Sequence, residues 1–84
     1  MIQPSEVESA RKAYDARAWR DAREAYELAG SRTALEAEDL ERLARTALLT
    51  GDDEAYVDGL AQASQAWTSR GELARAAECA FGNA

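Results

Sequence analysis

Apolar side chains recur every three or four residues along most of the chain, which is the spacing of one face of an α-helix. Five segments have this period, approximately residues 5–17, 18–30, 36–50, 52–70 and 72–84. Tyr56, Leu60, Ala63 and Trp67 form the clearest apolar stripe. Because the connections are short, neighbouring helices should pack as antiparallel hairpins. The pattern therefore predicts an all-α fold of about five helices.

Several residues between these segments have the chemistry of helix ends. Two pairs have the spacing of a capping box, Ser5 with Glu8 and Thr33 with Glu36. Three glycines are expected to end the second, third and fourth helices, namely Gly30, Gly51 and Gly71. Asp52 and the two acidic residues after it should begin the fourth helix, where carboxylates stabilise the positive end of the helix dipole.

The chain also resembles itself at a separation of 34 residues. This shift superimposes small residues on small residues, as in Ala10 on Ala44, Ala13 on Ala47 and Ala29 on Ala63. It places Tyr26 on Leu60 and Arg17 on Gly51. The length and pattern of this repeat resemble the tetratricopeptide repeat, a helical hairpin that stacks in arrays. The resemblance implies one domain over residues 1–84, with units at about 4–34 and 35–70 and a partial third unit at 72–84.

Three departures make this array degenerate. The aromatic residue expected early in the first helix of each unit is Glu6 in one unit and Leu40 in the other. The proline that ends each typical unit is absent. The shift of 34 residues does not continue cleanly into the third unit, so the fourth helix should be longer than usual. A three-helix or five-helix bundle without repeat geometry is the alternative.

Three runs of sequence resemble a narrower group of proteins, the helical regions of LuxR-type transcriptional regulators from actinobacteria. They are residues 37–44, 51–54 and 75–81. The resemblance implies that this chain is the N-terminal part of a larger regulator whose DNA-binding helix-turn-helix lies further along. The abundance of alanine and arginine agrees with a GC-rich genome.

The distribution of charge argues against direct contact with nucleic acid. The chain has a net charge of −6, and all of it falls in residues 36–84, which hold four basic and ten acidic side chains. Nucleic-acid affinity depends mainly on neutralising phosphates, so such a module should have a basic face. No run of sequence resembles a signal peptide, and none has the length of a membrane span. We therefore expect a cytoplasmic protein without a membrane partner.

The inventory of reactive side chains predicts a protein that is not an enzyme. The chain has no histidine, which excludes a Ser-His-Asp triad, a Cys-His pair and a histidine metal site. Asp52, Asp53 and Glu54 are most simply a solvated helix start. The single cysteine, Cys79, lies on an alanine-rich face and is expected to be a small buried residue. No catalytic residue, metal or cofactor is predicted.

Aromatic residues at helical spacing usually belong to a core. Tyr26, Tyr56 and Trp67 are therefore expected to be buried, with Gly59 marking a close approach of two helices. Trp19 either wedges the turn between the first two helices or stays partly exposed.

A partner-binding surface follows from the resemblance, because the first helix of each unit lines the concave face of a tetratricopeptide array. Matched by position, that face comprises Arg11, Tyr14, Arg45, Leu48 and Leu49. Arg11 and Arg45 could bind a carboxylate of a partner bidentately. Alternatively, both arginines could simply pair with Glu8 or Glu41 of the same chain.

The end of the array suggests a second surface. Leu73, Ala77 and Phe81 lie on a fifth helix with no second helix to complete its hairpin, and repeat arrays need a polar cap at their ends. We therefore expect this edge to support a homodimer. The main hypothesis is a non-catalytic segment that binds a protein or peptide within a larger regulator. The alternatives are a small-molecule sensor and a free-standing helical protein that associates with itself.

Overall fold

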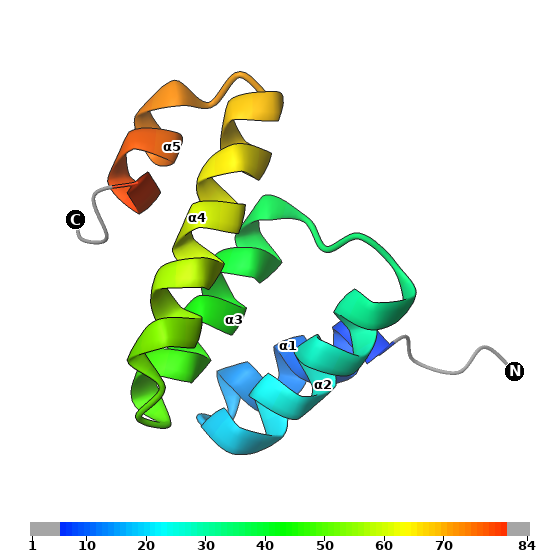
Figure 1. Ribbon diagram of the computed structural model, residues 1–84. Helices are drawn as coiled ribbons and strands as arrows, with labels where there is room; N and C mark the ends of the chain where they lie inside the picture. The colour runs from blue at the N-terminus through cyan, green and yellow to red at the C-terminus, as the bar shows by residue number, and fades with distance from the viewer. Residues whose placement is uncertain (1–5, 81–84) are drawn as a thin grey trace, which may run out of the picture.

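The computed structural model describes residues 6–80, and every regular element in this range is a helix (Figure 1). The helices are α1 (Glu6–Asp15), α2 (Trp19–Arg32), α3 (Ala37–Leu49), α4 (Asp53–Ser69) and α5 (Leu73–Ala80). This confirms the predicted all-α fold of five helices. The length of α4, 17 residues against 14 for α2, also agrees with the expected long fourth helix.

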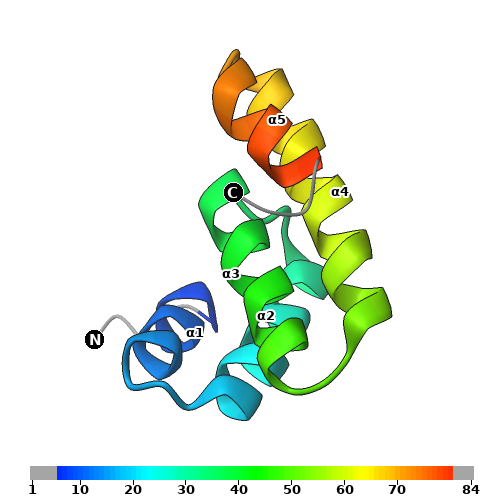
Figure 2. The ribbon, with the colours of Figure 1, turned by 90° about the vertical axis from the view of Figure 1, so that its left-hand side faces the viewer.

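Successive helices form hairpins, and the hairpins are layered. The largest interface joins α3 to α4, followed by those of α1 with α2 and of α4 with α5. Across the two complete hairpins, α3 packs on α2 and makes a smaller contact with α1. As a result α1, α3 and α5 follow one another along one side of the molecule (Figure 2).

One arginine joins the two hairpins at the α3–α4 turn. The guanidinium group of Arg23, on α2, donates a hydrogen bond of 3.0 Å to Thr50 Oγ1 and another of 2.7 Å to Asp52 Oδ2. The hydrogen bond from Arg23 and that from the Ala55 amide, in this order of importance, lower the pKa of Asp52. Asp52 is thus both the N-cap of α4, as the sequence predicted, and the anchor for α2.

Two of the three predicted glycine stops are confirmed. Gly51 and Gly71 have φ angles of +86° and +79°, which glycine adopts without the steric cost that a Cβ would bring. The prediction for Gly30 was wrong, because α2 continues through it to Arg32. The backbone of Gly30 stays helical, and Leu35 packs over it, so a Cβ there would lie 3.4 Å from Leu35 Cδ1.

The second predicted capping box was also wrong. Thr33 ends α2 in an extended conformation, and its backbone N–H donates to Ala29 O. Glu36 is itself the N-cap of α3, with no hydrogen bond from its side chain to the helix. The linker therefore begins two residues later than the sequence suggested. Ser5, of the first predicted box, lies outside the described residues.

The turn between α1 and α2 contains the one non-glycine residue with positive φ in the described part of the chain. Arg17 has a φ of 61°, and α1 ends before it, at Asp15. The 34-residue shift places Arg17 on Gly51, so the two equivalent turns share a left-handed residue. The repeat thus appears in the backbone of the turns as well as in the small residues of the helices.

Arg17→Gly should stabilise the protein, because a non-glycine residue in this region costs about 1–2 kcal/mol. The greater freedom of glycine in the unfolded chain offsets part of this gain, so we expect an increase of up to about 1 kcal/mol. Gly51→Ala should destabilise the protein by about 1 kcal/mol. No neighbouring atom lies within 4 Å of the Cβ position, so backbone strain is the only cost of this change. Urea denaturation measures both changes, and equal stability of all three proteins would contradict the argument.

The core is narrow and built mostly from small side chains. Its main cluster comprises Ala37, Ala63, Trp67, Ala76 and Cys79. A Cβ added to Gly59 would lie 2.8 Å from Ala44 Cβ, so this glycine allows the close approach of α3 and α4, as predicted. Small residues at these crossings bring the helix backbones together and leave little internal space.

The aromatic residues divide into buried and partly buried groups. Tyr26 and Trp67 are buried, at 0% and 4% exposed, which confirms their prediction. Tyr56 is only half-buried, so its assignment to the core was too strong; it lies at the edge of the α4–α5 interface. Trp19 is half-buried and packs edge-on against Tyr14, with 5.2 Å between ring centroids.

Candidate functional site

Two of the three carboxylates on α3 each accept hydrogen bonds from more than one other helix. One faces the first hairpin and the other faces α4 and α5. Each accepts several hydrogen bonds from groups that are distant in the sequence. Together they determine which side chains remain available for a ligand on the α1–α3–α5 side.

The first carboxylate, Asp39, is 1% exposed and is the centre of a network among α1, α2 and α3. Arg11 donates from Nε to Oδ1 at 3.0 Å and from Nη2 to Oδ2 at 2.6 Å. The buried Tyr26 hydroxyl and Arg42 also donate to Oδ1, at 3.0 and 3.2 Å. Burial by itself would raise the pKa of Asp39, but the hydrogen bonds from Arg11 and Tyr26 outweigh it and lower that pKa. Asp39 is therefore an ionised structural centre.

The second carboxylate, Glu41, holds α4 and α5 on α3. Its Oε1 accepts hydrogen bonds from Trp67 Nε1 and Cys79 Sγ, both at 2.9 Å, and its Oε2 accepts one from Arg75 at 3.1 Å. The guanidinium carbons of Arg75 and Arg70 each lie 4.8 Å from the centroid of the Trp67 ring. These cation–π contacts fix the last two helices around one indole ring.

Cys79 behaves as the small buried residue that the sequence predicted. It is 4% exposed, and burial, followed by the hydrogen bond to Glu41, raises the pKa of its thiol to about 12. A thiol with such a pKa stays protonated near neutral pH and is a poor nucleophile.

A shallow hollow of about 260 Å³ lies between these networks, on the side formed by α1, α3 and α5. Its lining is Tyr14, Glu38, Glu41, Arg42, Arg45 and Arg75. We call these six residues the A-face hollow. Most of its charged groups already have partners: Arg42 binds Asp39, Arg75 binds Glu41, and Glu38 binds Arg70 at 2.7 Å. Arg45 is exposed and has no hydrogen-bond or ion-pair partner within residues 6–80.

The structure brings together only part of the predicted binding face. Tyr14 and Arg45 line the same hollow. Arg11 does bind a carboxylate bidentately, but that carboxylate is the chain's own Asp39, which the sequence argument had not considered. Leu48 and Leu49 are exposed, at 43% and 48%, and do not line the hollow.

The residues of the predicted self-association edge are exposed where the structure describes them. Leu73 is 67% exposed, and Ala77 is also exposed. Phe81 lies outside the described residues.

Neither carboxylate network was predicted from the sequence: Glu41 was named only as a possible partner of Arg11 or Arg45, and Asp39 was not named although a signal existed for it. Asp39 lies one helical turn before Leu43, at the edge of the apolar stripe of α3. An acidic residue at such a position needs basic or hydroxyl partners, which Arg11 and Tyr26 provide. No comparable signal marks Glu41, because its partners come from α4 and α5 and their register depends on the packing.

No group of three or more potential ligand side chains within residues 6–80 is arranged to hold a metal ion. In the same range no helix combines the length and the apolar character needed to cross a membrane.

Comparison with known proteins gives no match. The chain fits no protein-family model, and neither curated proteins nor solved structures show significant similarity to it.

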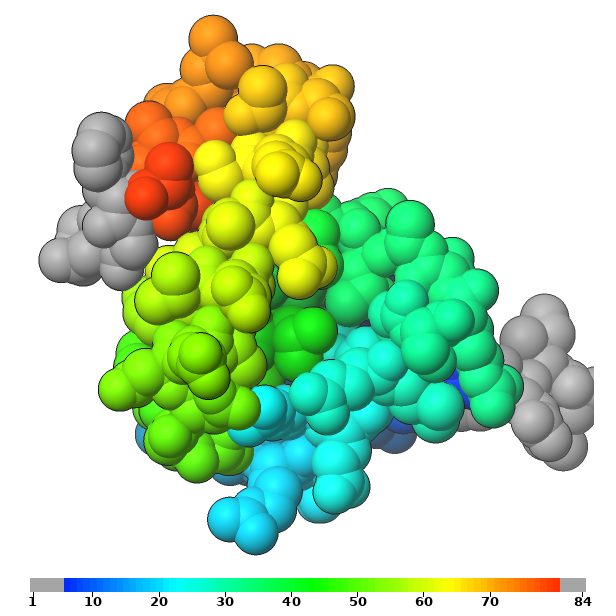
Figure 3. Space-filling view, viewed as in Figure 1, coloured from blue at the N-terminus to red at the C-terminus, as the bar shows by residue number. Residues whose placement is uncertain are grey.

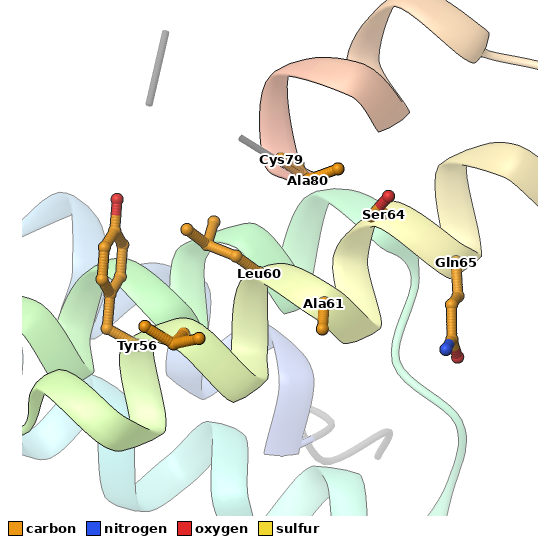
Figure 4. A pocket seen from close by; sticks show the side chains of 8 residues that line it. Tyr56, Leu60, Ala61, Ser64, Gln65, Cys79 and Ala80 are labelled. Carbon is orange, nitrogen blue, oxygen red and sulfur yellow. The ribbon is translucent and has the colours of Figure 1, made fainter. Parts of the chain in front are cut away.

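Two other hollows repeat along the molecule. The first groove lies between α2 and α3, where Tyr26, Glu27, Gly30 and Ser31 face Leu43. Figure 3 shows a depression here, with atoms of α3 at its floor between α4 and α2. The second groove, of about 600 Å³, lies between α4 and the end of α5 (Figure 4). Its lining includes Val57, Leu60, Ala61, Ser64, Gln65 and Cys79.

Proposed function

We propose that this chain is a non-catalytic, cytoplasmic interaction segment that binds a protein or peptide through the A-face hollow. The observation that supports the proposal most directly is the exposed guanidinium group of Arg45, which has no partner among residues 6–80 in a hollow whose other charges are paired. Arg45 lines this concave surface together with Tyr14.

The geometry favours a ligand group that is anionic and small. Arg42 and Arg75 are held by Asp39 and Glu41, so their charges are largely neutralised and Arg45 is the group left to bind an anion. Arg45 can reorient and form a bidentate pair with a carboxylate, the geometry that guanidinium groups prefer. The ring of Tyr14 offers an apolar surface next to it. An acidic side chain or a C-terminal carboxylate, next to an apolar residue, fits this arrangement.

Selection from a displayed peptide library on the immobilised protein tests the proposal. We expect enrichment of peptides with a carboxylate next to an apolar residue, and a roughly tenfold or greater loss of affinity in Arg45→Gln, because hydrogen bonds to charged groups contribute about 1.5–3 kcal/mol. Arg20→Gln is the matched control, since Arg20 is also exposed and has no partner within residues 6–80, but lies on α2, outside the hollow. Equal binding by both variants, or enrichment of basic peptides, would contradict the proposal.

The wider assignment, to the N-terminal part of a LuxR-type transcriptional regulator with tetratricopeptide-like repeats, is also a proposal. It is supported by the hairpin order and by the 34-residue shift that relates the turns at Arg17 and Gly51. Sequencing the parent gene on both sides of this region tests it. We expect a downstream helix-turn-helix in the same reading frame, and a parent without any DNA-binding domain would refute the assignment.

A further inference from the structure

The first and second grooves occupy equivalent places in the repeat. Four residues of α2 line the first groove, and the 34-residue shift places them on four residues of α4 that line the second: Tyr26 on Leu60, Glu27 on Ala61, Gly30 on Ser64 and Ser31 on Gln65. Each groove thus forms where the second helix of one unit meets the first helix of the next. What lies over the first groove therefore indicates what could lie over the second.

The two grooves differ in their third wall. Over the first groove, α4 contributes Gln62, so the following helix of the array closes that groove on one side. Within residues 6–80 no helix follows α5, and the second groove is lined by α4 and α5 alone. The position that α4 has over the first groove is therefore vacant over the second, among the described elements.

The second groove has an uncharged lining, whereas Glu27 lines the first groove. Its outer wall is accessible: Val57 is 62% exposed, and Ala61 and Gln65 are exposed as well. Figure 4 shows Leu60 and Ser64 of α4 facing the end of α5, where Cys79 and Ala80 lie. A helix resting here would cover a continuous apolar strip.

Acidic side chains border this strip on α4. Glu54 lies one turn before Val57, and Asp58 lies one turn before Ala61, so both stand beside the groove on the helix surface. Both are exposed, and neither has an ion-pair partner among residues 6–80. The apolar strip therefore has a negative border that a complementary partner would have to match.

We infer that the second groove binds an amphipathic helix of another protein, with small apolar residues along one face and lysine or arginine beside them. The helix would take the position that α4 occupies over the first groove. Its apolar face would cover Val57, Leu60 and Ala61, and its basic residues would approach Glu54 and Asp58. This surface is separate from the A-face hollow, so it would serve a second partner.

A second copy of this chain fits the groove less well. The part of the chain that forms the groove carries the entire net charge of −6, so two such halves would repel one another. Attraction between opposite charges speeds association and determines which partners are accepted, and it favours a basic helix here. Self-association is therefore an alternative result of the experiment and would refute the inference.

A displayed library of amphipathic helices about 20 residues long, with a fixed Leu/Ala stripe and with Lys, Glu, Gln or Ser at the flanking positions, provides the test. We expect selection on the protein to enrich lysine at the flanks. The best peptide should produce saturable shifts in the amide signals of Val57, Ala61 and Gln65 in NMR spectra. Val57→Lys should weaken binding roughly tenfold or more. The double variant Glu54→Gln with Asp58→Asn should make peptide binding less dependent on salt concentration.

Leu28→Lys is the matched control, because Leu28 is a similarly exposed apolar residue on α2, outside the groove. It should leave binding unchanged, as should Arg45→Gln, which separates this result from a failure of the A-face proposal. Four results would overturn the inference: no saturable binding, enrichment of acidic flanks, shifts confined to another surface, or shifts in these signals that depend on protein concentration alone. The last would indicate a homodimer. Loss of this binding when the protein is extended by the segment that follows it in its gene would also overturn the inference, because it would show that the chain's own next helix covers the groove.

Discussion

Trp67→Ala is expected to lower the free energy of unfolding by about 3–5 kcal/mol, which is the usual cost of deleting a large buried aromatic side chain. The ring is 4% exposed and belongs to the main core cluster. Its removal also leaves Arg70 and Arg75 without the surface on which they stack, and it takes away one of the donors to Glu41. Because these groups join α3, α4 and α5, we expect α5 to loosen first.

Trp67→Phe separates packing from hydrogen bonding. This variant keeps most of the apolar surface and loses the indole N–H, so its cost should be clearly smaller, at about 1–2 kcal/mol. Urea denaturation followed by circular dichroism measures both variants, with the unchanged protein beside them. If Trp67→Ala left the denaturation midpoint unchanged, the α3–α4–α5 cluster would not be the core of this protein.

Asp39→Ala is expected to destabilise the protein by about 2–4 kcal/mol, even though it removes a charged group from the interior. The Tyr26 hydroxyl is completely buried and would lose its acceptor, and an unsatisfied buried donor costs about 1–3 kcal/mol. The side chains of Arg11 and Arg42 are 44% and 39% exposed, so water can solvate them once the carboxylate is removed. The loss of their ion pairs with Asp39 therefore adds less to the destabilisation. Asp58→Ala, at an exposed site on α4, should change stability by no more than about 0.5 kcal/mol.

A double-mutant cycle identifies the buried hydrogen bond. Tyr26→Phe removes the donor while the carboxylate keeps Arg11, so this single change should cost about 1 kcal/mol. In the Tyr26→Phe background, Asp39→Ala no longer leaves an unsatisfied hydroxyl, and its cost should fall. Strict additivity of the two changes would mean that this hydrogen bond does not contribute to stability.

Stability should also decrease in acid, and Asp39 should be responsible for part of that decrease. Its pKa is lowered in the folded protein, so below a pH of about 4 the unfolded chain binds more protons than the folded chain. The stabilisation is complete above the unfolded pKa and is lost as the pH falls through the folded one. Asp39→Asn should therefore lose less stability than the unchanged protein between pH 6 and pH 3, as measured by urea midpoints across that range. An equal or larger loss would contradict the assignment.

The sequence by itself determined the helices and most of their limits. The period of the apolar residues, the glycines at positions 51 and 71 and the acidic cap at Asp52 act over a few residues, and each was found where it was predicted. The wrong predictions of a helix end at Gly30 and of a capping box at Thr33 also have a local explanation. Glycine is tolerated inside a helix at about 1 kcal/mol, and here Leu35 packs over the last turn of α2 and favours its continuation.

Only the tertiary structure decided which charged groups are free. The sequence could place Arg11 and Arg45 at equivalent positions, but their surroundings differ because α3 presents the buried Asp39 to Arg11. The residue 34 positions after Asp39 is Leu73, and Arg45 has no carboxylate partner among the described residues. Whether a side chain is used internally depends on contacts between residues about 28 positions apart, which hydrophobic periodicity does not encode.

The same reason applies to the grooves. In the sequence, Val57 is one of many apolar positions. In the structure its side chain is 62% exposed beside α5, and this exposure depends on how the hairpins pack against one another. The sequence thus determined that equivalent grooves should recur, because the repeat places equivalent residues on α2 and α4. The packing decided that α4 partly covers the first groove, whereas none of the described helices covers the second in the same way.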